Sequence, residues 1–130
     1  MSVDEIALTL PGDDAFHGVA HLVLSGLGSR HDLTVDTLDD LNLAVDAVLE
    51  RYGESVEELT VRARIGDEGV VIEIGPFPDS RLQSELEQEA GDALDMRRIL
   101  RTVCDHIAVV ERDGGAWVEL TKRIVRDERA

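Results

Sequence analysis

Apolar and polar residues alternate in two stretches of the chain, and this alternation is typical of strands with one buried face. The longer stretch covers residues 59–65, and a shorter one covers residues 6–10. Residues 70–74 follow the longer stretch after a glycine-containing turn, so these two segments predict a β-hairpin. The solvent-facing side of this hairpin would carry Thr60, Arg62 and Arg64.

Apolar residues spaced three and four apart predict three helices. The first covers residues 15–27 and is ended by Gly26 and Gly28, because glycine commonly terminates a helix. The second covers residues 37–52, and the third covers residues 93–106. The predicted core faces are Phe16, Val19, Ala20, Val23, Leu24 and Leu27 in the first helix, Leu38, Leu41, Val45, Val48, Leu49 and Tyr52 in the second, and Met96, Ile99, Leu100, Val103 and Cys104 in the third.

The remaining segments complete a two-layer plan. Residues 75–78, Gly-Pro-Phe-Pro, are expected to end the second hairpin strand, and the acidic residues 79–92 predict a loop or a weak exposed helix. Residues 107–111 and 117–121 predict a closing hairpin, and residues 125–130 a frayed tail. This order predicts an α+β fold, a two-layer sandwich in which a mostly antiparallel mixed sheet of about five strands carries three helices on one face.

Composition narrows the kinds of partner. Residues 1–130 form a chain of one-domain length, and 43% of them are hydrophobic, enough for a real core. The formal charge is −15, which disfavours direct binding to nucleic acid or to an anionic membrane and favours a protein partner with a basic face. The alternative is that the acidity only keeps the protein soluble. The single cysteine, Cys104, excludes an intramolecular disulfide, and no apolar run or signal peptide points to a membrane, so we expect a cytoplasmic protein.

Several segments carry a family resemblance. Residues 40–47, Asp-Leu-Asn-Leu-Ala-Val-Asp-Ala, look like an asparagine-box helix, and residues 71–77 occupy the place of a first glycine box. Residues 96–109 and 117–122 look like the helix after an ATP lid and the last hairpin. Together, they resemble the anti-sigma-factor and serine-kinase branch of the histidine-kinase/gyrase ATPase superfamily. The resemblance implies an Mg-ATP site, a lid-equivalent loop at residues 79–92, a sigma factor or an anti-sigma antagonist as partner, and homodimers.

The motif positions depart from the family pattern. ATP-using members carry a glutamate and, four residues later, a magnesium-binding asparagine on one helical face, whereas this chain has Ala47 and Arg51. A shift by one residue would offer acids instead, but it rotates the pair by about 100°, away from the pocket. Gly75 stands where the first glycine box supplies an aspartate, and Leu94 and Met96 stand where the second box has glycines. These replacements predict a degenerate ATP site.

The sequence therefore favours a regulatory protein-binding domain of the anti-sigma type, with no catalytic residue and no cofactor. The alternatives are an ATP-binding serine/threonine protein kinase that uses Mg-ATP and acts on an anti-anti-sigma-type partner, and a purely structural homodimer subunit. His17 and His21 lie four apart but lack a third ligand, so we expect no metal site. The predicted partner-binding residues are Arg97, Arg98, Arg101, Glu85 and Glu89.

Overall fold

A computed structural model describes residues 4–78, 81–87, 94–112 and 114–124 of the chain. Its elements follow the predicted order of strand, two helices, hairpin, helix and closing hairpin. A short helix is added in the acidic segment, and a single turn of 3-10 helix precedes the first long helix. In chain order the elements are β1 Asp4–Pro11, α1 His17–Arg30, α2 Val35–Tyr52, β2 Glu58–Ile65, β3 Gly69–Phe77, α3 Arg81–Glu87, α4 Leu94–Val103, β4 His106–Arg112 and β5 Gly115–Arg123.

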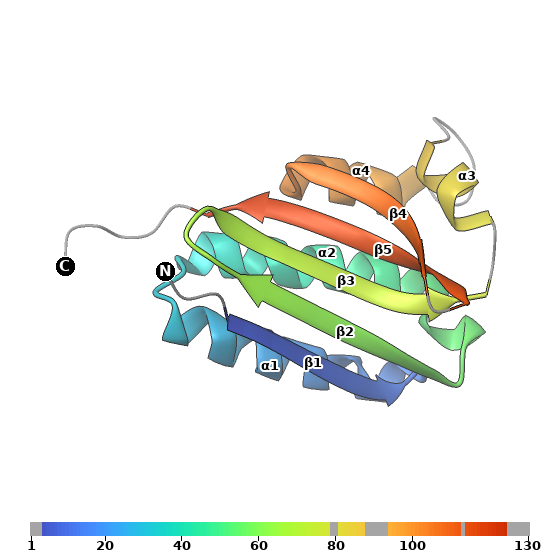
Figure 1. Ribbon diagram of the computed structural model, residues 1–130, viewed down its shortest axis with the longest axis horizontal. Helices are drawn as coiled ribbons and strands as arrows, with labels where there is room; N and C mark the ends of the chain where they lie inside the picture. The colour runs from blue at the N-terminus through green and yellow to red at the C-terminus, as the bar shows by residue number, and fades with distance from the viewer. Residues whose placement is uncertain (1–3, 79–80, 88–93, 113, 125–130) are drawn as a thin grey trace.

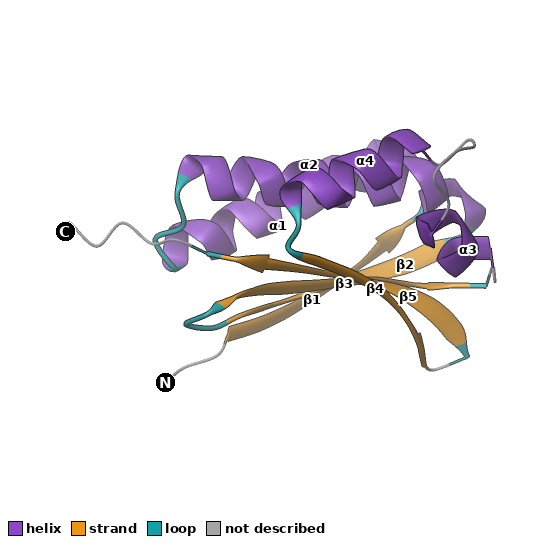
Figure 2. Cartoon of the chain, turned by 90° about the horizontal axis from the view of Figure 1, so that it is seen from above, coloured by secondary structure: helices purple, strands orange, loops and turns teal. Residues whose placement is uncertain are grey.

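The five strands form one sheet in the order β1-β2-β3-β5-β4, and every neighbouring pair is antiparallel. Helices α1, α2 and α4 cover one face of this sheet, and α3 lies beside one end of it (Figures 1 and 2). The structure thus confirms the predicted two-layer α+β sandwich. None of the helices in the described part of the chain is long and apolar enough to cross a membrane.

Helix α2 lies at the centre of the core. Its residues Val45, Val48 and Leu49 are completely buried, as the predicted stripe required. The helix begins two residues earlier than predicted, because the Thr34 side chain accepts a hydrogen bond from the backbone N–H of Thr37 at 3.1 Å and caps it. The sheet meets α2 with the inward residues of its central strands, namely Leu59, Val61, Ala63, Ile65, Val70, Ile72, Ile74, Val118 and Leu120.

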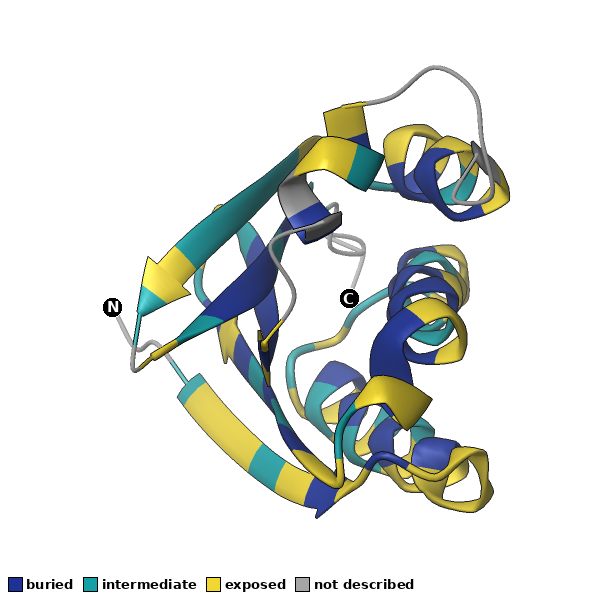
Figure 3. Cartoon of the chain, turned by 90° about the vertical axis from the view of Figure 1, so that its right-hand side faces the viewer, coloured by how far each residue is buried: buried dark blue, intermediate teal, exposed yellow. Residues whose placement is uncertain are grey.

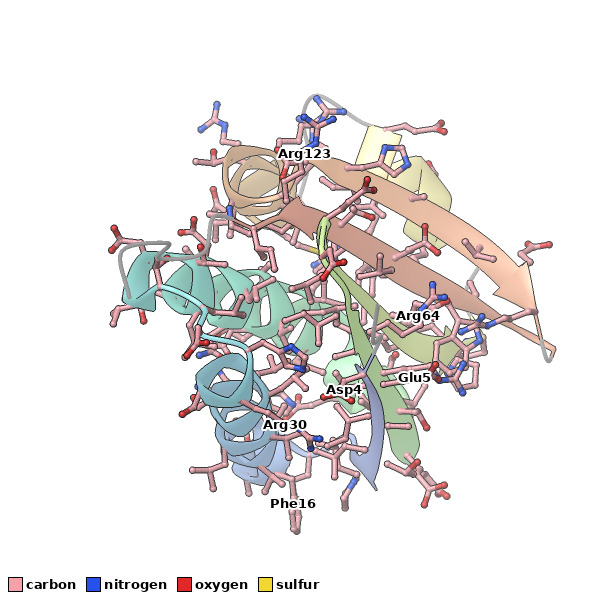
Figure 4. All side chains as sticks on the ribbon, turned by 60° about the vertical axis from the view of Figure 1, so that its left-hand side comes forward. Asp4, Glu5, Phe16, Arg30, Arg64 and Arg123 are labelled. Atoms are coloured by element: carbon pink, nitrogen blue, oxygen red, sulfur yellow. The ribbon has the colours of Figure 1, made fainter. Side chains whose placement is uncertain are left out.

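Helix α1 differs from its prediction in length and in orientation. It continues through both glycines to Arg30, and Gly28 is buried where the helix meets α2. A Cβ atom on Gly28 would lie 3.1 Å from Cδ1 of Leu38, so the glycine allows the two helices a close approach. The predicted buried face was wrong at Phe16 and Val19, which are exposed, and Phe16 projects away from the sheet (Figure 4). The buried positions are His17, Ala20, Leu24 and Gly28.

Three other boundaries also differ from expectation. Strand β3 does not stop at Gly75 but continues to Phe77 through an irregularity in its pairing with β5, because the Phe77 side chain is buried in the core. Helix α4 ends at Val103, because β4 already begins at His106. The expected loop over residues 79–92 contains α3, whose Leu82 and Leu86 are buried, so this helix is anchored rather than exposed. The predicted frayed tail, residues 125–130, lies outside the described residues.

Candidate functional site

The nucleotide position implied by the sequence lies where the end of α2, the end of β3, helix α3 and the start of α4 meet. The family motif places its paired side chains on α2, and this helix carries Ala47 and Arg51 there. Ala47 is buried within the core and has no polar side-chain atom. A magnesium ion prefers oxygen ligands, and neither an alanine methyl nor a guanidinium provides one. The pair on α2 therefore does not fit a magnesium–phosphate group.

Arg51 is instead paired with an acid from the short helix α3. Its Nη2 donates to Oε2 of Glu85 at 2.6 Å, and its Nε donates to Oε1 of the same carboxylate at 3.4 Å. The hydrogen bond from Arg51 to Glu85 raises the pKa of Arg51 further above its ordinary value, so the side chain stays charged. This two-point contact joins the last turn of α2 to α3.

Tyr52, the next residue of α2, contacts the same carboxylate. Its hydroxyl donates a short hydrogen bond to Oε1 of Glu85. Its ring lies 5.5 Å from the ring of Phe77 at the end of β3, at a tilt of 48°. Burial, and then the hydrogen bond to Glu85, raise the pKa of Tyr52 far above its ordinary value, so the phenol remains a hydrogen-bond donor at any physiological pH. We call Arg51, Tyr52 and Glu85 the α2–α3 latch.

Apolar contacts hold α3 in the same place. Leu82 is 1% exposed and Leu86 is 8% exposed, although the helix has only seven residues. A helix this short is unstable on its own, so these two buried leucines and the latch fix its position. The segment that the resemblance equates with an ATP lid therefore includes a packed helix.

The end of β3 uses its glycine for packing. A Cβ atom on Gly75 would lie 2.9 Å from the carbonyl oxygen of Ala116 and 2.9 Å from Cδ2 of Trp117, so the indole lies directly on the glycine backbone. Arg62 and Arg112 flank that indole, with their Cζ atoms 5.7 and 4.7 Å from the ring centroid. Pro76, which follows, has no backbone N–H to offer a ligand. Gly75 thus makes room for Trp117 on the open face of the sheet.

The start of α4 holds the other replaced motif positions. Leu94 is the first residue of the helix, and Met96 is buried in the core. Arg97 is also buried, at 4% exposure, and its Nη1 has no hydrogen-bond partner among the described residues. Two cavities among the described residues, of about 480 and 400 Å³, are not lined by Ala47, Arg51 or Met96.

Four of the five predicted partner-binding residues lie in the described part of the chain, and they are not all accessible. Arg98 and Arg101 are exposed on α4, but Arg97 is buried beside them and Glu85 belongs to the latch. The fifth predicted residue, Glu89, lies outside the described residues. The structure therefore brings only Arg98 and Arg101 together on accessible surface.

The two histidines considered as metal ligands have other surroundings. His21 lies 2.6 Å from Oδ1 of Asp46 and links α1 to α2. His17 is buried, and a Cβ atom on Gly53 would lie 3.0 Å from its Nε2. In the described ranges, no three His, Cys, Asp or Glu residues are placed to share a metal ion.

Sequence reasoning missed the partnership within the latch. Arg51 was recognised only as a replacement, and Tyr52 only as part of the core stripe of α2. The available signal was charge complementarity between a basic residue at a motif position and the acidic segment that follows β3.

Comparison with known proteins supports the resemblance on which these positions rest. The chain is 27% identical to the serine-protein kinases RsbW of Bacillus velezensis, Listeria monocytogenes and Bacillus subtilis. Each match covers 93% of this chain and 86–88% of the relative. These matches confirm the resemblance to the serine-kinase branch across nearly the whole chain. No family model matches the sequence.

Proposed function

We propose that this chain is a regulatory protein-binding domain of the anti-sigma type that acts without binding ATP. The observation that carries the proposal is the α2–α3 latch. A guanidinium stands where the family pattern has a magnesium-binding asparagine, and it is paired with Glu85 at 2.6 Å. A nucleotide at this position would have to break that pair and to displace a helix that buries two leucines.

The partner proposed is a protein such as a sigma factor or an anti-sigma antagonist, met in the cytoplasm. The relatives are serine-protein kinases, and protein kinases act on other proteins, so a protein partner fits the resemblance. The charge of −15 favours a partner with a basic face. We also propose that copies of the chain pair as homodimers, as the resemblance implies.

The second candidate is an ATP-dependent serine/threonine protein kinase. The relatives favour it, because RsbW is a serine-protein kinase in each of the three species. This candidate requires Mg-ATP as a cofactor. It also requires α3 to leave the position described above when the nucleotide binds.

Calorimetric titration with Mg-ATP separates the two candidates. We expect no heat of binding at millimolar nucleotide and no change in the melting temperature, with RsbW of Bacillus subtilis as the positive control. A ligand at one hundred times its Kd stabilises a protein by about 2.7 kcal/mol, which raises the melting temperature of a domain this size by several degrees. A saturable heat together with such a rise would establish the kinase candidate in place of ours.

A further inference from the structure

The two edges of the sheet are built differently. At the β1 edge, Oδ2 of Asp4 lies 3.2 Å from Nε of Arg30 and 2.7 Å from Nε2 of His31. These contacts join the start of the strand to the end of α1 (Figure 4). Glu5 follows Asp4, and Pro11 ends the strand. Charged residues and proline are the features that keep a sheet edge from pairing with another chain. The β1 edge is therefore protected.

The β4 edge lacks these features along most of its length. Its residues Ile107, Ala108, Val109 and Val110 form an unbroken apolar run, and each of them is half-buried (Figure 3). Strand β4 pairs only with β5 and ends the strand order of the described sheet. Within the described residues, its outer side therefore presents backbone N–H and C=O groups that have no strand partner.

A cavity of about 480 Å³ runs beside this edge on the helical side of the sheet. Helix α3 contributes Leu86 to its wall, and α4 contributes Arg101 and Cys104. Strand β4 contributes Ile107 and Val109, whose side chains lie on the helical side of the sheet. Because alternate side chains of a strand point to the same side, a strand paired with β4 would direct every second side chain into this cavity.

We infer that the β4 edge binds an extended segment of a partner protein, which adds a sixth strand to the sheet. The backbone of β4 supplies the hydrogen bonds, and the cavity accepts alternate apolar side chains. Asp105 lines the cavity, and Glu111 lies on the same side of β4 near the other end of the strand, so basic residues that flank the apolar part of the segment would find an acid at each end of the cavity side.

Charge decides between a partner segment and a second copy of this chain. Each copy carries −15, so two β4 edges gain no electrostatic attraction from pairing, and the homodimer proposed above would use another surface. A basic extended segment gains attraction from the same charge. The inference rests on the proposed function, since it names the surface through which a protein-binding domain would hold its partner.

The test uses a blocked peptide of about six residues that alternates valine and lysine. In the full chain labelled with nitrogen-15, the peptide should shift the amide signals of β4 and slow their hydrogen exchange. The same peptide with N-methylated valines should bind at least tenfold more weakly, because it has lost backbone donors. Shifts confined to other elements, equal binding of the methylated peptide, or no binding would overturn the inference.

Two matched variants test whether the peptide binds at the β4 edge. Ala108 and Ala7 are both on the open face of the sheet, on the opposite edge strands β4 and β1. Ala108→Lys should weaken peptide binding at least tenfold through repulsion of its lysines, whereas Ala7→Lys should leave it unchanged. Equal effects of both variants would overturn the inference. A dimer of the chain that Ala108→Lys dissociates would assign the edge to a second copy and also overturn it.

This outcome is separate from that of the nucleotide titration. Mg-ATP binding with normal peptide binding would remove the proposed function and leave the β4 surface in place. If the chain binds neither Mg-ATP nor the peptide, the proposed protein-binding function stands, and the partner surface lies elsewhere than at the β4 edge.

Discussion

Arg51 and Glu85 stand 34 positions apart in the chain, yet their side chains meet in the latch. The departure of Arg51 from the family motif was predicted, because the motif position depends only on residue spacing within one helix. The contact with Glu85 was not predicted, because it depends on how α3 docks against α2. At the scale of the residue, the sequence showed which side chain occupies the motif position, but not which side chain it contacts.

Cys104 offers a residue-scale test of burial. Burial raises the pKa of its thiol to about 11, from an ordinary value near 9. We expect alkylation by iodoacetamide at pH 8 to be far slower in the folded chain than in urea, because only the thiolate reacts. Equal rates in both states would show that the fold does not shield this half-buried thiol.

The same shift gives this thiol a defined effect of pH on stability. The unfolded thiol loses its proton near pH 9 and the folded thiol near pH 11, so the unfolded state binds fewer protons in between. The contribution of Cys104 to stability is therefore complete below about pH 9 and is lost as the pH rises toward 11.

Val45 tests the core face of α2. It is completely buried, and Val45→Asp would place an unpaired charge in the core. We expect this variant to lose about 3–5 kcal/mol of unfolding free energy, or not to fold, as measured by urea denaturation. The matched control is Leu43→Asp on the same helix, where the side chain is 46% exposed and the loss should be below about 1 kcal/mol. Equal losses in the two variants would contradict the assigned face.

At the scale of elements, segments with a strong apolar period were predicted correctly, whereas glycines were wrongly taken to mark the ends of elements. Helix α2 and strand β2 were predicted because their apolar residues keep a single period, and β3 because an apolar run follows β2 after a glycine-containing turn. Helix α1 was misplaced because glycines were read as its end, whereas Gly28 allows close contact with Leu38. Strand β3 was stopped too early at Gly75 for a related reason, since that glycine makes room for Trp117.

Helix α3 was the element that local pattern described least. Its sequence is polar and short, and its described anchors include two buried leucines and the carboxylate of Glu85. Such anchoring is tertiary, so a method based on periodicity sees a loop or a weak helix. The position of the latch could not be predicted for the same reason.

Removing the Tyr52 hydroxyl tests whether the latch holds α3. Tyr52→Phe keeps the ring against Phe77 but deletes the hydrogen bond to Glu85. We expect the amides of α3 to exchange faster with solvent in this variant, while those of residues 43–49 keep their rates. Hydrogen bonds to charged groups contribute about 1.5–3 kcal/mol, so the change in exchange should be at least tenfold.

A matched hydroxyl deletion serves as the control. Thr102→Ala removes a hydroxyl that donates to the carbonyl of Arg98 within α4 and has no role in the latch. It should leave the exchange of α3 unchanged. Faster exchange throughout the chain in Tyr52→Phe would mean that the hydroxyl supports the whole fold and not the docking of α3.

At the scale of the whole molecule, charge is distributed unevenly between the two faces. The open face of the sheet carries four arginines and four glutamates, which balance. Sequence composition gave the total of −15 but not this division, because the division depends on strand register. These eight residues are Arg62, Arg64, Arg112, Arg123, Glu5, Glu58, Glu73 and Glu119.

The excess of acids must therefore lie on the helical layer, the loops and the chain ends, where like charges repel one another. Salt screens such repulsion, with a Debye length of about 10 Å at 0.1 M and about 3 Å at 1 M. It also weakens exposed ion pairs, but isolated surface pairs contribute only about 0–1 kcal/mol each. The repulsion that salt removes from a molecule of charge −15 should outweigh the stability lost from these ion pairs.

We expect the melting temperature to rise by several degrees between 0.02 and 0.5 M sodium chloride, measured by circular dichroism. A melting temperature that falls over this range would show that ion pairs such as Arg51–Glu85 and Arg112–Glu73 contribute more to stability than the net charge removes.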